Sequence, residues 1–157
     1  MATGTDNATR DLVELEGIGP PGNIVVHQVA AGVQIFKGTM LSFAADWGLC
    51  PASDTHADPD SYVVGVALHG TDNRLGEVGD RNIRFETDRV FAVMNATGVR
   101  IGLPIGVPMG VSSDHSVAPI NEDETIVGYY YGMHDDGRVR VMITGKAKQF
   151  PAAPEPA

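Results

Sequence analysis

The rarest side chains of this chain, and among those with the most distinctive chemistry, are its single cysteine, Cys50, and its single tryptophan, Trp47. Both lie in the stretch GTMLSFAADWGLCPA, residues 38–52. A reactive thiol needs a nearby cation or histidine to lower its pKa, and no Lys, Arg or His flanks Cys50 in the sequence. Trp47 and Leu49 indicate apolar surroundings instead, which would raise the pKa of the thiol. We therefore interpret Trp47 and Cys50 as buried packing residues of a core or an interface.

The histidines do not have the spacing of a metal site. None of the five stands in an HxH or HExxH arrangement, which would place two ligands on one face; they are His27, His56, His69, His115 and His134. The segments DTHADPD (54–60) and MHDDG (133–137) each combine a His with carboxylates, a composition typical of solvated loops. No metal site and no cofactor are predicted.

Catalytic motifs are equally scarce. The segment GIGPPGN (17–23) is glycine-rich, but its prolines remove the N–H donors that a phosphate loop needs. Carboxylates that could form an acid–base pair are more typical of charged sheet corners: Glu86, Asp88, Glu122, Asp123 and Glu124. One enzyme hypothesis stays open, a trimeric β-fold hydrolase whose site lies between subunits and uses Asp46, Asp114 and His115.

One pattern occurs twice in the chain. GTMLSFAADWGLCPA is matched by GVPMGVSSDHSVAPI, residues 106–120, and each copy is followed by a Val-Gly strand, VVGVAL or IVGYYYG. The matched positions are Gly38 and Gly106, Leu41 and Met109, Asp46 and Asp114, Leu49 and Val117, Pro51 and Pro119. This repetition predicts an internally duplicated strand–turn–strand unit, in which the two aspartates bond turn backbones. Gly65 and Gly128 are predicted to allow close approach of another backbone.

Composition and periodicity predict an all-β protein. The 157 residues are 43% hydrophobic and include 19 Gly and 10 Pro, more than helical bundles tolerate. The run 62–68 fits a strand buried on both faces or the seam of a small barrel, and HDDG between alternating runs predicts a hairpin. We expect a flexible arm over 1–23, a small β-barrel or β-tulip-like domain over 24–145, and a mobile Pro/Ala-rich tail over 146–157.

Net charge limits the partners. At −9, with a pI of about 4.8, the chain repels phosphate backbones and anionic membranes, so neither nucleic acid nor membrane is expected to bind directly. The start of the sequence is polar and has no apolar signal region, and a lone cysteine fits a reducing compartment. We expect the protein to be cytosolic when made.

Seven residues are predicted to contact partners. The arm could add its apolar residues to the sheet edge of a neighbour. In the run of tyrosines, Tyr129 and Tyr131 share one face of a strand and Tyr130 the other, so at least one ring should lie on a surface, where tyrosines favour interfaces. With the tryptophan, the predicted partner-binding residues are Leu12, Val13, Leu15, Ile18, Trp47, Tyr129 and Tyr131.

With these strands placed, the chain resembles the head decoration (cement) proteins of tailed bacteriophages over roughly residues 24–145. The resemblance rests on GVQIFKGTMLSF, a Gly and Pro turn, VVGVAL, FETDRVFAVMN and the closing GRVRVMIT. It implies a homotrimer on the outer surface of the capsid, at three-fold and quasi-three-fold sites. There it would bridge subunits of the major capsid protein and resist the pressure of packaged DNA, with no substrate or cofactor.

The same resemblance implies that the protein is in the host cytoplasm during assembly and then in the virion. The loop 52–61 and the Pro-rich tail depart from the shorter members of that family. Besides the hydrolase, a phage tail or baseplate module and a carbohydrate-binding β domain stay open as alternatives.

Overall fold

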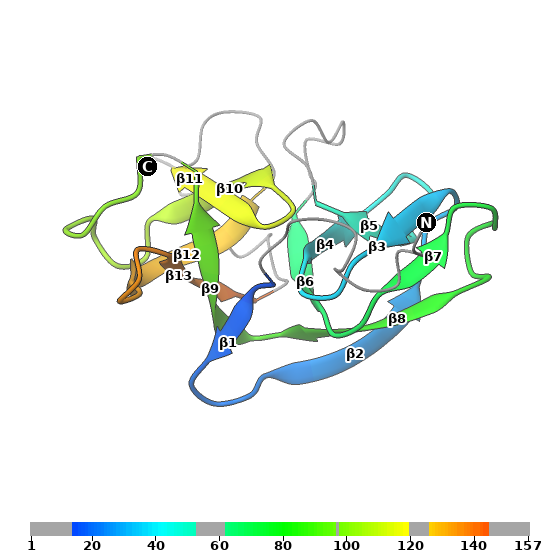
Figure 1. The fold of residues 1–157 in the computed structure, drawn as a ribbon, viewed down its shortest axis with the longest axis horizontal. Helices are drawn as coiled ribbons and strands as arrows, with labels where there is room; N and C mark the ends of the chain where they lie inside the picture. The colour runs from blue at the N-terminus through cyan, green and yellow to red at the C-terminus, as the bar shows by residue number, and fades with distance from the viewer. Residues whose placement is uncertain (1–13, 53–61, 97, 120–125, 145–157) are drawn as a thin grey trace, which may run out of the picture.

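The computed structural model describes residues 14–52, 62–96, 98–119 and 126–144. This part of the chain forms thirteen strands and no helix, so the predicted all-β class is confirmed. No helix that could span a membrane occurs among these residues. The strands form two small barrels that lie side by side along the long axis of the molecule (Figure 1).

The C-terminal half forms a closed barrel of five strands. Its strands follow in the order β9-β11-β10-β12-β13, and β13 pairs again with β9. Their bounds are β9 Arg89–Asn95, β10 Pro108–Ser113, β11 Ser116–Pro119, β12 Ile126–Met133 and β13 Val139–Ile143. The predicted hairpin is the β12–β13 pair, whose turn is closed by hydrogen bonds between His134 and Arg138 and between Gly137 and His134.

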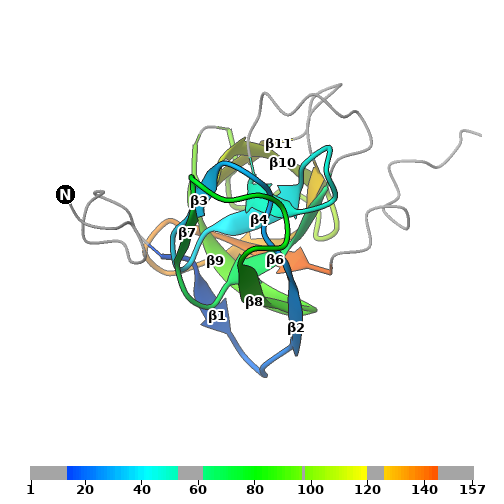
Figure 2. The same ribbon diagram turned by 90° about the vertical axis from the view of Figure 1, so that its right-hand side faces the viewer.

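The N-terminal half forms a five-stranded sheet in the order β2-β8-β6-β4-β5. Its strands are β2 Asn23–Gln28, β4 Met40–Phe43, β5 Leu49–Pro51, β6 Val63–Ala67 and β8 Asn82–Thr87. Its two outer strands meet where Val29 forms a parallel bridge with Leu49, and this sheet is called the first barrel below. Figure 2 shows this end of the molecule, with β2 at the margin of the sheet.

The two barrels have one topology, so the duplication is larger than the predicted strand–turn–strand unit. In each, two strands meet in parallel where the barrel closes, Val29 on Leu49 in the first and Asn95 on Val117 in the second. Equivalent hydrogen bonds recur in the two barrels. The Ala30 N–H donates to the Leu49 carbonyl, as the Ala96 N–H donates to the Val117 carbonyl. The Gly38 N–H donates to the Ala67 carbonyl, as the Gly106 N–H donates to the Tyr130 carbonyl. All five strands are therefore repeated, including β2 and β9, whose sequences show little likeness.

An irregularity in the strands is repeated as well. The register of β4 on β6 shifts between Leu41 and Ser42, and that of β10 on β12 shifts between Met109 and Gly110. Because Leu41 and Met109 are matched positions of the sequence repeat, both copies bend at the same place. A β-bulge of this kind re-aims the strand that carries it.

The glycines of the two Val-Gly strands have the predicted role. A Cβ added at Gly65 would overlap the carbonyl of Glu86, and one added at Gly128 would overlap the carbonyl of Met142. Both carbonyls belong to the neighbouring strand of the same barrel. The expectation that Gly65 and Gly128 admit a close backbone is confirmed.

Two hydrophobic cores share a wall. All five residues of β6 are buried, as predicted for a strand covered on both faces. Val63 and Val66 pack in the core of the second barrel, whereas Val64 and Ala67 pack in that of the first. In β4 the neighbours Met40 and Leu41 divide in the same way.

Three short strands lie outside the duplicated set. β1 (Glu16–Ile18) pairs with β9, and β3 (Val33–Ile35) pairs with β7 (Thr71–Asn73). Residues 14–23 thus belong to the folded β structure, because Leu15 is buried in the core and its N–H bonds the Gly38 carbonyl. The rest of the predicted arm, 1–13, and the predicted tail, 146–157, lie outside the described residues, as does most of the loop 52–61.

The close approach at Gly128 gives a stability prediction. Gly128→Ala should lower the free energy of unfolding by roughly 3 kcal/mol, because the new methyl group cannot fit against the Met142 carbonyl without moving a strand. Urea unfolding followed by tryptophan fluorescence measures the change. Gly65→Ala should behave alike.

The control is Gly32→Ala. Gly32 has φ +75° and open space around it, so this change adds left-handed strain of roughly 1 kcal/mol and no clash. If Gly128→Ala costs no more than Gly32→Ala, the two strands do not approach as described.

Candidate binding surfaces

The Cys50 thiol sits in a structural position. It is half-buried, and its Sγ lies 4.0 Å from the Ser42 hydroxyl of the paired strand β4. Burial raises the pKa of the thiol, and the negative charge of Asp46 raises it further against the effect of Ser42. The interpretation of Cys50 as unreactive is supported, because a raised pKa leaves little thiolate at neutral pH.

Asp46 has the predicted turn role. Its Oδ1 accepts the N–H of Gly48 at 2.9 Å and its Oδ2 accepts the N–H of Ala31 at 3.1 Å, so both oxygens bond the backbone of the first barrel. Asp114, at the matched position of the second barrel, lies 2.9 Å from Nδ1 of its neighbour His115. The hydrolase hypothesis needs Asp46, Asp114 and His115 in one site between subunits, and one of the three, Asp46, already holds a turn.

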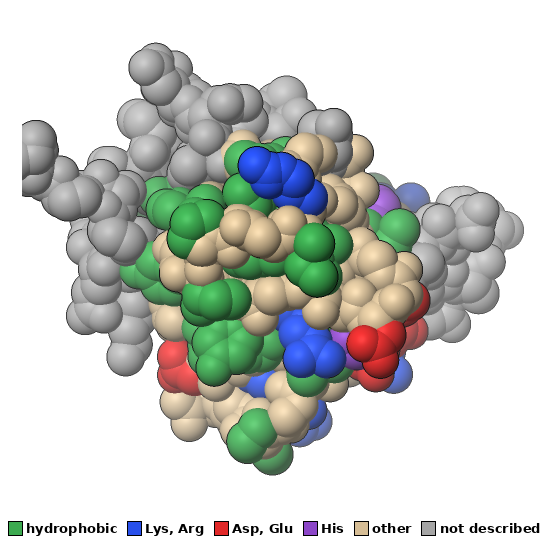
Figure 3. Space-filling view, turned by 90° about the vertical axis from the view of Figure 1, so that its left-hand side faces the viewer, with side chains coloured by type: hydrophobic (Ala, Val, Ile, Leu, Met, Phe, Trp, Pro, Cys, Tyr) green, Lys and Arg blue, Asp and Glu red, His purple; other side chains and the backbone are tan. Residues whose placement is uncertain are grey.

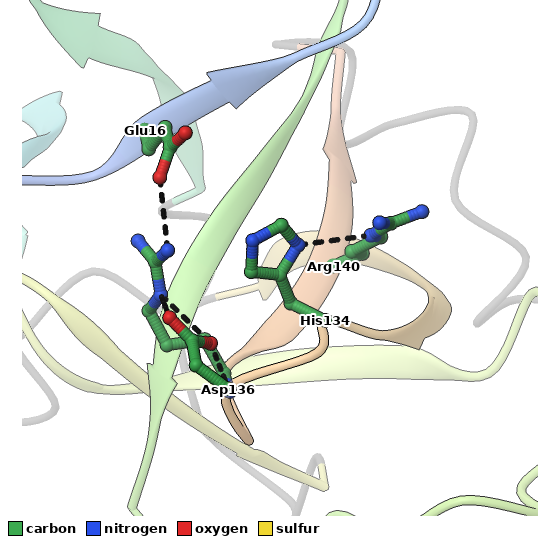
Figure 4. Close-up of polar contacts among 5 residues, drawn as sticks. Glu16, His134, Asp136 and Arg140 are labelled. Atoms are coloured by element: carbon green, nitrogen blue, oxygen red, sulfur yellow. Dashed lines mark hydrogen bonds and ion pairs between the residues drawn. The ribbon is translucent and has the colours of Figure 1, made fainter.

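A polar cluster joins β1 to the β12–β13 hairpin (Figure 4). Arg138 donates to Glu16 at 2.8 Å and, through Nε, to Asp136 at 2.9 Å. The backbone N–H of Arg138, and then its guanidinium, hold the pKa of Asp136 below its usual value. The ring of His134 accepts from Arg140 at 3.3 Å. These contacts explain His134 and Asp136 of MHDDG as structural ties.

Carboxylates at the junction of the barrels are also paired. Glu86 is buried and accepts the N–H of Gly22 at 2.8 Å and the guanidinium of Arg89 at 3.1 Å. Asp88, with φ +62°, accepts from Asn23 at 2.7 Å. Both therefore hold the chain where it enters β2 and where it passes from β8 to β9. Across the described ranges, no three His, Cys, Asp or Glu residues are grouped to hold a metal ion.

The structure separates the residues predicted to contact partners. Leu12 and Val13 lie outside the described residues, and Leu15 is buried in the core of its own chain. Ile18 and Tyr131 come together in a groove of about 310 Å³ beside the β1–β2 connection. Of these two, Tyr131 is 51% exposed.

The remaining predicted residues are the other tyrosine and the tryptophan. Tyr129 is half-buried, and desolvation raises its pKa. Trp47 is not a core residue, because 69% of it is exposed, whereas its contact with a partner stays a prediction. Asp46 fixes the turn, Trp47 adopts a left-handed φ of 65°, and its ring packs edge-on against Phe43.

One exposed apolar region, apart from the predicted residues, is the tip loop, defined as residues 98–107 between β9 and β10. Its hydrophobic side chains alternate: Val99, Leu103 and Val107 pack against the core, whereas Ile101 is 80% exposed and Ile105 is 62% exposed. Figure 3 shows hydrophobic side chains gathered on this end of the molecule.

The tip loop is held firmly. The hydroxyl of the buried Tyr130 donates to the Arg100 carbonyl at 3.1 Å, and Asn95 donates to the Val99 carbonyl at 2.8 Å. Gly106 donates to the Tyr130 carbonyl at 2.8 Å. The loop is therefore pre-organised, which lowers the entropy that a contact through its isoleucines must overcome.

The duplication explains why this loop is exposed. The equivalent connection of the first barrel, between β2 and β4, contains β3, which pairs with β7 and buries Ile35 completely. β7 comes from the long β6–β8 connection, whereas the equivalent β12–β13 connection is a tight turn. The second barrel thus has no counterpart of β7 in the described residues, and its isoleucines stay uncovered.

The other exposed apolar region is the β2 edge, defined as Ile24, Val25 and Val26. Their exposed fractions are 56%, 39% and 59%. Sequence reasoning missed both the β2 edge and the tip loop. The available signal was the absence of charge from NIVVHQ and from IGLPIGVP, in a chain with 20% charged residues.

Known proteins show little similarity to this chain. No protein-family model matches the chain, and no curated protein matches it. Among solved structures, it is similar to the head fiber gp8.5 N base of bacteriophage phi29, with 16% sequence identity and a TM-score of 0.46. The match covers 78% of this chain and 96% of that one.

The raised pKa of Cys50 predicts slow alkylation. Near pH 8, iodoacetamide should modify the folded protein about tenfold more slowly than the unfolded chain, and the folded rate should rise with pH beyond the range of a free thiol. Mass spectrometry over time, with and without guanidinium chloride, measures both rates. Equal rates would mean that Cys50 is solvated.

Proposed function

We propose that this protein is a capsid decoration protein, which binds the outer surface of a phage head and stabilises the shell against internal pressure. The head decoration proteins of tailed phages are the class that the sequence resembles. The observation that carries the proposal is the tip loop, which presents Ile101 and Ile105 on a firmly held backbone at one end of a double barrel.

The tip loop fits a protein partner better than a small molecule. Exposed, contiguous apolar side chains on a soluble protein mark interaction sites, and a convex loop has no cavity to enclose a ligand. A pre-organised apolar loop can enter a hydrophobic depression between shell subunits. Many copies on one shell would then add stability through many small contacts.

We further propose the arrangement that the resemblance implies: a homotrimer at three-fold or quasi-three-fold sites that contacts the major capsid protein, without enzymatic activity. In support, the Asp46 carboxylate, the Cys50 thiol and the His134 ring are engaged in contacts of the fold. The protein would assemble from the host cytoplasm onto the virion.

A binding experiment tests the proposal. Ile101→Lys combined with Ile105→Lys should weaken binding to expanded, undecorated heads of the encoding phage by at least about tenfold, because two charges would replace the buried anchors. Cosedimentation with the heads measures binding, and calorimetry measures the melting temperature of the shell, which the wild-type protein should raise.

The matched control is Leu75→Lys, at a fully exposed leucine in the β7–β8 connection of the other barrel. It should bind like the wild type. A wild-type protein that neither binds the heads nor raises their melting temperature contradicts the proposed function. Unchanged binding by the double variant would show that the tip loop does not make the contact.

A further inference from the structure

The two barrels differ at one strand edge. β2 and β9 are equivalent strands, since Val25 pairs with Phe85 of β8 as Phe91 pairs with Val141 of β13. On its other edge, Phe91 pairs with Gly17 of β1, and the pairing extends over residues 90–92. The equivalent edge of β2 is residues 24–26, and no strand in the described parts of the chain pairs with it.

The missing strand leaves a large difference in exposure. Val26 is 59% exposed, whereas the equivalent Ala92 is 1% exposed beneath β1. Val25 is 39% exposed, and the equivalent Phe91 is 3% exposed. β1 thus shows what a covering strand does at this position of the fold: it pairs antiparallel over three residues and removes the edge from water.

The β2 edge lacks the features that keep edge strands from pairing. Such strands are usually protected by charged side chains, by proline or by a bulge. The strand NIVVHQ contains no Lys, Arg, Asp, Glu or Pro, and its register on β8 runs from Asn23 to Gln28 without a shift. As far as the described residues go, its outer N–H and C=O groups are therefore open to an added strand.

We propose that the strand added to the β2 edge is β2 of a second copy of this chain, antiparallel about a two-fold axis at Val25. In this register Val25 faces Val25 of the other copy, Ile24 faces Val26, and Asn23 faces His27. Apolar side chains then meet apolar ones on both faces, polar ones meet at the ends, and no like charges face each other along the strand.

The concave surface next to β2 favours the same contact. Val25 and His27 line a depression of about 340 Å³ together with the aromatic residues Phe43, Tyr62 and Phe85. Pairing at Val25 brings the second copy against this apolar lining as well as against the strand edge. Five paired residues in each copy form a small interface, so we expect a dimer with a dissociation constant on the order of 10 µM.

The test is the mass of the full-length protein across a concentration series, by analytical ultracentrifugation at physiological salt. In solution, away from the shell on which the proposed homotrimer would assemble, the wild type should pass from monomer to dimer. Val26→Lys should weaken dimerisation at least tenfold, because two lysines would be brought to the paired edges, and it should stay folded because Val26 is exposed. Leu75→Lys is the matched control and should dimerise like the wild type.

Disulfide capture tests the register. In a Cys50→Ser background, Val25→Cys should form a covalent dimer on mild oxidation, because the two residues face each other at the axis. Leu75→Cys in the same background should not. A change at Val25 that unfolded the chain would show in its circular dichroism, and the Val26→Lys comparison does not depend on it.

Three results would overturn the proposal. The first is a wild type that stays monomeric up to several hundred micromolar. The second is an oligomer, of any size, that Val26→Lys leaves unchanged. The third is a monomer whose Val26→Lys variant loses binding to phage heads, which would make the shell the occupant of the β2 edge. The contact is independent of the proposed function, since head binding through the tip loop can fail while the dimer forms.

Discussion

The wall of β4 and β6 between the two barrels is the constraint on which the rest of this structure depends. Each barrel has five short strands and could bury little apolar surface alone, because small domains bury a smaller share of their surface. Sharing the wall solves this: Val63 and Val66 complete one core, and Val64 and Ala67 complete the other. Opening either barrel along this wall would therefore expose apolar surface belonging to both.

The topology that the two halves share also accounts for the positions at which they keep the same kind of residue. In each barrel the carbonyl of a neighbouring strand leaves no room for a side chain at one position, so glycine stands at both 65 and 128. The bulge recurs at Leu41 and Met109, where the strand must bend as the barrel curves. Elsewhere the sequences of the halves diverge, because hydrophobic residues of similar volume can replace one another in a core.

Structural features that have a local cause could be predicted from the sequence. The β6 run is apolar at every position because both faces are buried, and Asp-Gly marks the β12–β13 turn through its backbone preference. The full duplication could not be predicted, because β2 and β9 are related by their partners and not by their residues. Whether Trp47 lies in the core or on the surface could not be predicted, because its exposure follows from a left-handed turn that Asp46 holds, and sequence spacing does not show that.

The two halves share five equivalent strands, and their surfaces differ because different short strands accompany these five. β1 covers β9 and leaves β2 open, and β7 covers β3 and leaves the tip loop open. The two uncovered apolar regions thus belong to different barrels and to opposite kinds of structure, one a strand edge and the other a convex loop. A strand edge suits backbone pairing with another strand, whereas a convex loop suits insertion into a depression. If the chain contacts both its own copies and a second protein, as proposed, two surfaces with such different chemistry suit it, because each then excludes the partner of the other.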